Sequence, residues 1–349
     1  MRAVVFTGDS KLELIEFPDP TPGPRDVVLE IKASGMCGSD LKLYRPPAGA
    51  AFKALGLKDS GQPVIAGHEP CGVVAAVGRD VDSRIVRVGD RVTLHHYQGC
   101  WSCPQCRTGW TQMCDRTAVV YGVTGHGGHA PYMRAAVETV VALPEEVSFT
   151  TGAAISCGTG TAYGALLRLN VSARDTVAIF GQGPVGLSAT QLAAAMGARV
   201  IAVDVSTERA QQAKLFGAAH VVDASTEDPV EAIMALTHGK GAAKALDTSG
   251  AAAGRSAAVR CASAWGMVCF VGEGGEVTLN VSTEIIRKQL TLVGSWTLST
   301  TAQADCVRFI ADHGIDVDKL FTDRWTLDQA EEAYKSFDKQ AAGKGVFIN

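Results

Sequence analysis

The pattern of apolar and polar positions changes character along the 349-residue chain. Up to residue 36 it consists of short strand-like runs, RAVVF, KLELIEF and DVVLEIKAS, with a Pro/Gly-rich break at Pro18–Pro24. Short alternating runs between breaks of this kind are typical of β-strands that follow one another without helices. We therefore predict a β-rich N-terminal body.

From Thr176 onward, strand-like and helix-like stretches alternate. Thr176–Phe180 is apolar and β-branched, as a buried parallel strand requires, and an Ala- and Leu-rich helical stretch follows it up to Met196. Arg199–Val203 is a second apolar strand. Further strand–helix units predict an α/β fold class with a doubly wound parallel sheet, whose later strands are expected at 220–223, 244–247, 267–271 and 290–294.

A complete G-x-G-x-x-G motif connects the first of these strands to its helix. Its first glycine permits a tight turn, its second lets a pyrophosphate approach the backbone, and its third lets the helix pack on the strand. A lone motif of this kind also occurs as a simple turn, but here strand, motif, helix and second strand are in register. We expect a dinucleotide to contact the motif residues Gly181, Gly183, Pro184, Val185 and Gly186.

The second strand ends in Asp204, and this residue bears on which dinucleotide binds. A carboxylate at this position accepts hydrogen bonds from the adenosine ribose hydroxyls and repels a 2′-phosphate. Arg209 is basic but lies further along the chain, and we count it among the cofactor-binding residues. The sequence therefore predicts NAD in preference to NADP.

Bulk composition excludes several classes of protein. Charged residues make up 19% of the chain, apolar residues 46%, and the net charge is −4 without a long basic run, so nothing indicates binding to nucleic acid or to a membrane surface. We find neither a signal peptide nor an apolar run long enough to cross a membrane. Ten cysteines in such a chain indicate metal ligands and free thiols in a reducing compartment, and we expect a cytoplasmic protein.

Four cysteines occur close together, in the pattern C-x₂-C-x₂-C-x₇-C. Four thiolates at this spacing can form a closed tetrahedral shell around one structural zinc ion. Disulfides between such close neighbours would be strained, and a ferredoxin-type cluster would end in Cys-Pro, whereas Asp115 follows here. A closed site leaves no position for a substrate, so the chemistry must lie elsewhere. The predicted ligands are Cys100, Cys103, Cys106 and Cys114.

The arrangement of motifs resembles the zinc-dependent medium-chain dehydrogenase/reductase superfamily, the alcohol and polyol dehydrogenases. The motifs GHEPCGVVAAVG, GDRV, the four-cysteine lobe and GQGPVG occur in the family's order and spacing, and the resemblance covers essentially the whole chain. It implies a GroES-like β-rich catalytic domain, residues 1–152 and 296–349 with the zinc lobe at 95–115. A Rossmann-type NAD-binding domain, residues 153–295, interrupts it.

The resemblance also implies a second, catalytic zinc ion. Taken singly, Cys37 and His68 would be weak candidates, because a lone Cys or His is more often a core residue. They match the family's first two zinc ligands, and Cys157 falls at the third position. Glu69 matches a glutamate that approaches the metal, and Asp40 matches the acid that orients the His imidazole.

Further roles follow from the same resemblance. Ser39 matches the hydroxyl that starts the proton relay, although a serine there can also cap the following helix. Lys42 stands where many relatives have a histidine, which leaves the later relay open. At least one of His95 and His96 is expected at the substrate site, with strand-end packing as the alternative. Thr161 matches a threonine near the nicotinamide, where the backbone at Val271 and Gly272 is also expected.

The sequence thus predicts a zinc-dependent oxidoreductase that transfers a hydride between NAD and a secondary alcohol or polyol-like substrate. The alternatives are a reductase of activated C=C or C=N bonds on the same fold and a non-catalytic NAD-binding protein. The expected partners are a small alcohol or ketone and further copies of the chain, in a homodimer or homotetramer. The substrate itself is not identified, because its pocket depends on loops such as Arg45–Gln62.

Overall fold

The computed structural model describes residues 1–54, 61–339 and 343–349, so part of the Arg45–Gln62 loop lies outside the described residues. The chain divides into two compact units. Unit 1 comprises Met1–Cys157 and Ser299–Asn349, and unit 2 comprises Gly158–Leu298. The boundaries predicted from the sequence, after residues 152 and 295, fall close to the limits of these units. That these limits separate a catalytic domain from an NAD-binding domain stays a prediction.

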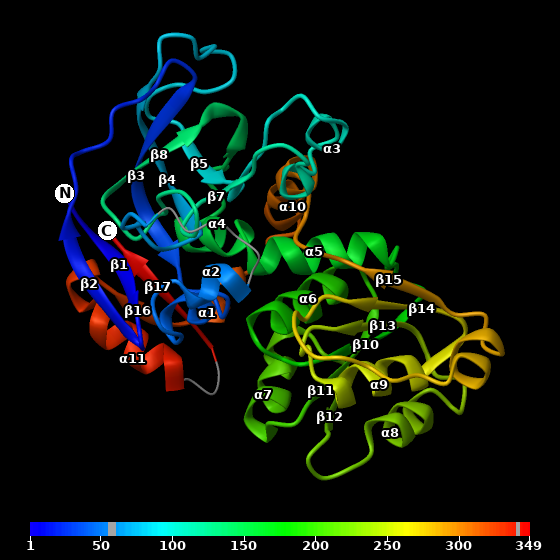
Figure 1. Cartoon of the computed structure of the whole chain (residues 1–349). Helices are drawn as coiled ribbons and strands as arrows, with labels where there is room; N and C mark the ends of the chain where they lie inside the picture. The colour runs from blue at the N-terminus through cyan, green and yellow to red at the C-terminus, as the bar shows by residue number, and fades with distance from the viewer. Residues whose placement is uncertain (55–60, 340–342) are drawn as a thin grey trace. The chain divides into compact units, whose positions relative to one another are not determined.

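Unit 1 is built on a seven-stranded sheet with the order β16-β17-β3-β4-β5-β9, in which β8 also pairs with β3 (Figure 1). All of its pairings are antiparallel except β16 with β17. A hairpin of β1 and β2 and a small β6–β7 ribbon complete the strands. The strands are β1 (Arg2–Gly8), β2 (Lys11–Glu16), β3 (Asp26–Gly35), β4 (Glu69–Val77), β5 (Arg91–Leu94), β6 (Tyr97–Gln98), β7 (Val119–Val120), β8 (Tyr132–Ala136), β9 (Val140–Ala142), β16 (Phe321–Trp325) and β17 (Lys344–Ile348).

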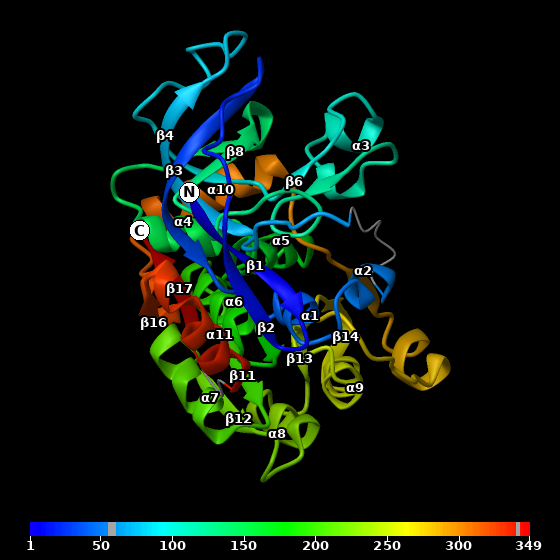
Figure 2. The same cartoon turned by 60° about the vertical axis from the view of Figure 1, so that its left-hand side comes forward.

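Some of the helices of unit 1 pack on this sheet. Helix α4 packs on β3 and β4, while α11 lies beside β2 and β17 in both views (Figure 1 and Figure 2). One core forms between the strands around Leu29, Val92 and Met133, and another joins Tyr44, Tyr334 and neighbouring apolar residues. The helices are α1 (Leu41–Tyr44), α2 (Ala50–Ala54), α3 (Pro104–Arg107), α4 (Phe149–Ile155), α10 (Thr300–Asp312) and α11 (Ala330–Lys339).

Unit 2 contains the parallel six-stranded sheet that the sequence predicts. The strand order β12-β11-β10-β13-β14-β15 is that of a dinucleotide-binding doubly wound fold. Every pairing is parallel, and the central strands β10 and β11 are buried on both faces, which explains their continuous apolar runs. The strands are β10 (Thr176–Phe180), β11 (Arg199–Asp204), β12 (His220–Asp223), β13 (Ala242–Asp247), β14 (Ala262–Phe270) and β15 (Thr291–Gly294).

The helices that follow β10 connect successive strands of this sheet, because parallel strands need a crossover between them. Helix α6 begins at Pro184, whose fixed φ suits the first turn, and Gly197 follows its end with φ +86°. Ser206 caps the next helix by accepting a hydrogen bond from Arg209 N. The helices are α5 (Gly158–Arg168), α6 (Pro184–Ala195), α7 (Thr207–Gln212), α8 (Pro229–Leu236) and α9 (Ala252–Arg260), with a π-helical turn at Val281–Ile286.

The tight turn between β10 and α6 gives a testable contrast between two of its glycines. A Cβ at Gly186 would lie 1.8 Å from Gly181 O, whereas a Cβ at Gly183 would meet no atom within 4 Å. We expect Gly186→Ala to destabilise the protein by about 1–3 kcal/mol, the usual scale of overpacking, and Gly183→Ala to have little effect. Urea unfolding of both variants, followed by circular dichroism, measures this. Equal midpoints for the two variants would contradict the described turn.

Candidate active site and metal centres

The three residues predicted to bind a catalytic zinc ion lie together in unit 1. Cys37 follows the end of β3, His68 immediately precedes β4, and Cys157 follows α4. Their ligand atoms and a carboxylate oxygen of Glu69 all lie within 4.8 Å of one another. The fold thus brings these four side chains from separate segments into one cluster, whereas sequence spacing alone could not relate them.

The donor set and its dimensions fit a zinc ion. The Sγ atoms of Cys37 and Cys157 are 4.0 Å apart, too far for a disulfide. Two thiolates on one tetrahedral zinc, each at a bond length near 2.3 Å, are about 3.8 Å apart. The Cys157 thiol lowers the pKa of Cys37 by hydrogen bonding, which favours the thiolate, the form that binds metals. Cys37, His68 and Cys157 would therefore hold a zinc ion. These three ligands leave the fourth position of a tetrahedral zinc ion open.

Asp40 orients the imidazole of the cluster. Its Oδ1 lies 2.7 Å from His68 Nδ1, and neither atom has another partner among the described residues. Its Oδ2 accepts a hydrogen bond from Cys37 N at 2.8 Å. A proton held on Nδ1 by this carboxylate leaves Nε2 free to face a metal. The predicted role of Asp40 has the geometry that it requires.

Ser39 lies beside the cluster and is exposed to solvent. Its Oγ is 3.1 Å from His68 Nε2 and 3.2 Å from Cys37 Sγ. The alternative, a helix cap, finds no support, because Asp40 occupies the N-cap position of α1 and makes no side-chain capping bond. The hydroxyl of Ser39 instead faces the residues that would hold the metal.

A buried lysine, which sequence reasoning missed, accompanies Glu69. Lys344 Nζ lies 2.7 Å from Glu69 Oε2 and donates to Glu69 Oε1 at 2.9 Å and to Met36 O at 2.8 Å. Burial raises the pKa of Glu69 to about 8, and the Lys344 ammonium opposes that shift. Glu69 thus lies between the metal cluster and a fixed cation. The signal in the sequence was a lysine that opens an otherwise apolar strand, KGVFI.

The two histidines that follow β5 are both buried, but they differ in position. His96 lies with its ring 5.3 Å from the His68 ring, and its Nδ1 is 2.6 Å from Ser156 O, next to Cys157. His95 contacts the Gln303 side chain instead, at 2.9 Å. Burial lowers the pKa of His95 to about 4 and that of His96 well below its usual value, so both imidazoles are neutral. Of the two, His96 is the one beside the cluster.

The four-cysteine lobe forms a second group of ligands. The four Sγ atoms lie within 4.8 Å of one another, and all four residues are free thiols. The N–H groups of Cys103 and Cys106 donate to the sulfurs of Cys100 and Cys103, at 3.3 and 3.5 Å. Gly99 has no room for a side chain, because a Cβ there would lie 2.4 Å from Cys106 Sγ. This shell fits the closed tetrahedral geometry of a structural zinc ion.

The predicted cofactor residues lie at the carboxyl ends of the strands in unit 2, with Thr161 in helix α5 and Arg209 in α7. Gly181 has φ +88°, and the α6 N-terminus begins without a side-chain cap after Gly183. Asp204 Oδ2 accepts a hydrogen bond from Gln182 N at 2.6 Å, so the acid is tied to the glycine motif. Open backbone N–H groups at a helix N-terminus fit a phosphate group.

The backbone after β14 supports the same edge of the sheet. The N–H groups of Val271 and Gly272 donate to Asp247 O at 2.9 and 3.1 Å. A Cβ at Gly272 would lie 2.2 Å from Gly250 N, so only glycine fits there. The structure thereby explains Gly272 by packing of the chain on itself, in addition to the approach of a cofactor that the sequence suggested.

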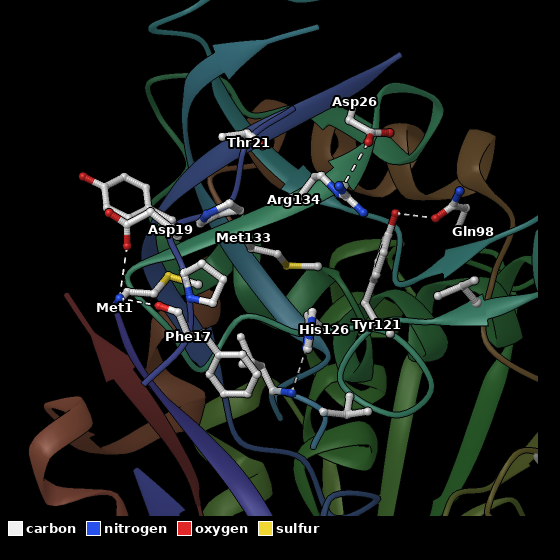
Figure 3. Close-up of a pocket in the computed structure, with 18 of the residues that line it drawn as sticks. Met1, Phe17, Asp19, Thr21, Asp26, Gln98, Tyr121, His126, Met133 and Arg134 are labelled. Carbon is white, nitrogen blue, oxygen red and sulfur yellow. Dashed lines mark hydrogen bonds and ion pairs between the residues drawn. The ribbon is translucent and has the colours of Figure 1, made fainter. Parts of the chain in front are cut away.

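One pocket of about 720 Å³ lies in unit 1 apart from the metal cluster (Figure 3). Phe17, Tyr121, His126 and Met133 line it, together with an ion pair between Arg134 and Asp26 at 3.5 Å. Gln62, from the Arg45–Gln62 loop, lines it, but none of the predicted catalytic, metal or cofactor residues does. This pocket therefore gives no evidence for the candidate active site. The evidence for that site is the cluster of possible metal ligands.

Comparisons with known proteins identify the family of the chain. Residues 23–145 match the alcohol dehydrogenase GroES-like domain family, and residues 184–312 match the zinc-binding dehydrogenase family. An uncharacterized zinc-type alcohol dehydrogenase-like protein, YphC of Escherichia coli (strain K12), is 40% identical over 100% of this chain and 98% of its own length. Sorbitol dehydrogenase of Bacillus subtilis (strain 168) is 29% identical over 95% of this chain and 92% of its own.

Solved structures give the same result for the fold. The structure of galactitol-1-phosphate dehydrogenase from Escherichia coli has a TM-score of 0.88 and 28% identity, and the match covers 100% of both chains. No helix among the described residues is long and apolar enough to span a membrane. With both family domains matched, a full-length relative at 40% identity and the predicted sheet in place, this chain belongs to the zinc-dependent medium-chain dehydrogenase/reductase superfamily.

Proposed function

We propose that the protein is an NAD-dependent zinc alcohol dehydrogenase that interconverts a secondary alcohol or polyol-like substrate and the corresponding ketone. The observation that carries this proposal is the cluster of Cys37, His68, Cys157 and Glu69, with their ligand atoms within 4.8 Å. Two similar proteins, sorbitol dehydrogenase and galactitol-1-phosphate dehydrogenase, are named for polyol substrates. Their names support the substrate class without identifying the substrate.

The chemistry divides between the metal site and the protein residues around it. Zinc held at this cluster supplies Lewis acidity, which lowers the pKa of an alcohol. Ser39 Oγ, 3.1 Å from His68 Nε2 and exposed, is placed to accept the alcohol proton and pass it toward solvent. Asp40 holds His68 in one orientation, and Glu69 with Lys344 places a paired carboxylate beside the ligands. A dinucleotide bound at the glycine motif would supply the nicotinamide ring as the hydride acceptor.

The rival activities explain the site less well. A reductase of activated C=C or C=N bonds, or a non-catalytic NAD-binding protein, needs neither an open three-ligand set nor a serine hydroxyl against the ligands. Both features are present here. We assign Cys100, Cys103, Cys106 and Cys114 to a structural zinc ion, which stabilises the lobe and takes no part in the reaction.

We propose a homodimer or homotetramer in a reducing compartment such as the cytoplasm. Strand β15 is the edge of the sheet in unit 2, and Leu292 within it is 37% exposed. An edge strand with unpaired backbone groups pairs readily with the same strand of a second copy. Ten unpaired thiols, with both ligand clusters among them, need a reducing environment to bind metal.

The preference for NAD depends on the carboxylate of Asp204. We expect Asp204→Ala to weaken NAD binding about 10-fold and to narrow the preference over NADP, because the acid no longer binds the ribose hydroxyls or repels a 2′-phosphate. Dissociation constants from fluorescence titration with NADH and NADPH measure this. Glu208→Ala, which removes an exposed acid in the neighbouring helix, is the matched control and should change neither value. A parent protein that binds NADPH more tightly would refute the assignment.

The role of Ser39 is tested by removing its hydroxyl. We expect Ser39→Ala to lower kcat by about 10²–10⁴-fold, the scale for a positioned proton-transfer group, while zinc content and NADH binding stay unchanged. Ser39→Thr keeps a hydroxyl and should retain most of the activity. A screen of alcohols and polyols, followed by NADH absorbance, supplies the substrate for these assays. Full activity in Ser39→Ala would exclude Ser39 from the proton path.

A further inference from the structure

A chain of buried polar side chains continues from Asp40 away from the metal cluster. Tyr334 OH donates to Asp40 Oδ2 at 3.2 Å, His129 Nε2 lies 2.8 Å from Tyr334 OH, and Ser34 Oγ lies 2.7 Å from His129 Nδ1. All four residues are 0% exposed. Burying a polar group lowers the stability of the fold unless the group is hydrogen-bonded. Apolar side chains could fill this space, so packing alone does not explain a connected row of polar ones.

Only one set of proton positions satisfies every member of this row. A carboxylate only accepts, so the Tyr334 hydroxyl donates to Asp40 and its oxygen accepts from a proton on His129 Nε2. His129 Nδ1 then carries a lone pair, which accepts the Ser34 hydroxyl proton. Burial lowers the pKa of His129 to about 4, and burial with the Asp40 charge raises the pKa of Tyr334. The imidazole is therefore neutral and the phenol protonated, as the row requires.

Rigid elements and close packing hold the row in place. Ser34 belongs to β3 and Tyr334 to α11, and the Tyr334 ring packs edge-on against Phe6 with centroids 4.9 Å apart. The His129 ring packs edge-on against Phe347 at 4.7 Å. Backbone bonds fix the segment that carries His129, because its N–H donates to Ala66 O at 2.9 Å and its carbonyl accepts from Val4 N at 3.0 Å.

Gly67, the residue before His68, lies against the His129 ring of the same row. Gly67 has φ +89°, and a Cβ there would lie 2.3 Å from His129 Nδ1. The backbone next to His68 therefore approaches the His129 ring more closely than any other residue would allow. Because His68 follows Gly67 directly, this glycine brings the backbone that carries His68 against the His129 ring.

We infer that Tyr334 and His129 are positioning residues for the catalytic metal site, acting on the His68 ligand through Asp40. By donating to Oδ2, Tyr334 holds the carboxylate so that its other oxygen, Oδ1, faces His68 Nδ1. Ser34 and His129 fix the direction in which Tyr334 donates. The inference rests on the proposed metal site, because it concerns how tightly His68 holds a metal there. It assigns neither residue a part in the chemical step.

The test is the rate at which zinc leaves the full-length protein. Tyr334→Phe removes one hydroxyl and keeps the ring, so Asp40 loses the donor that orients it. We expect one of the two zinc ions to be lost to excess EDTA about 10-fold faster than from the parent, the low end of the range for partners of metal ligands, while the four-cysteine zinc is retained. Elemental analysis at intervals during EDTA exposure, with Tm as a check on folding, measures this.

Tyr44→Phe is the matched control. Tyr44 is buried in the same apolar core, and its ring lies 5.4 Å from that of Tyr334, but it is not part of the row. Zinc loss from this variant should follow the parent. Equal rates of zinc loss for Tyr334→Phe, Tyr44→Phe and parent would overturn the inference while the metal site itself stands. A parent protein with zinc only at the four-cysteine lobe would instead overturn the metal site, and the inference with it.

A second variant keeps the inference testable if Tyr334→Phe does not fold. Ser34→Ala leaves His129 Nδ1 without its donor, so the imidazole can take up its proton there and the Tyr334 hydroxyl can turn from Asp40 to His129 Nε2. We expect faster loss of the same zinc ion, by a smaller factor than in Tyr334→Phe. Zinc retention equal to that of the parent in a folded Ser34→Ala protein would show that the far end of the row has no effect on the site.

Discussion

The structure around the proposed catalytic zinc depends on one constraint, which is that charged and polar side chains in a dry interior must be paired. His68, Glu69 and Asp40 are all buried next to the ligand cluster. Asp40 contacts His68 Nδ1 and accepts from Cys37 N, and Glu69 pairs with Lys344. Each partner comes from a different part of the chain, so the requirement for pairing holds β3, β4 and β17 to one geometry at the site.

The residues around the proposed catalytic zinc also differ in their exposure to solvent. Asp40, which contacts His68, and Lys344, which contacts Glu69, are both buried. Ser39, which contacts the same cluster, is exposed to solvent. A metal site that must exchange substrate needs a rigid ligand set and one accessible side. The four-cysteine lobe differs, because its four thiols lie within 4.8 Å of one another and could fill all four positions of a tetrahedral zinc ion.

Local patterns in the sequence were sufficient for the parallel sheet and the glycine motif. The strands at 176–180 and 220–223 were predicted with their observed limits, because apolar runs between glycine turns give strong signals. The four-cysteine lobe was also evident from spacing alone. Cys37, His68 and Cys157 could be related to one another only through the family resemblance, since nothing in their spacing indicates a common site. The cluster in the fold agrees with that grouping.

What the sequence could not reveal were contacts between distant segments. Lys344 lies in an apolar strand near the C-terminus, and its partner Glu69 belongs to β4. Ser34, His129 and Tyr334 form a row only because β3, the segment before β8 and α11 meet in the fold. Such pairs depend on the register between strands and on helix packing, and neither is encoded in a local pattern.

The most direct test of this account is the zinc content of the purified protein together with the zinc environment measured by X-ray absorption. Two zinc ions per chain are predicted, with a sulfur-rich average shell that contains an imidazole contribution from His68. In His68→Ala the imidazole contribution should disappear. A parent protein with a single zinc ion surrounded by sulfur alone would contradict the central claim, because the cluster of Cys37, His68 and Cys157 would then hold no metal.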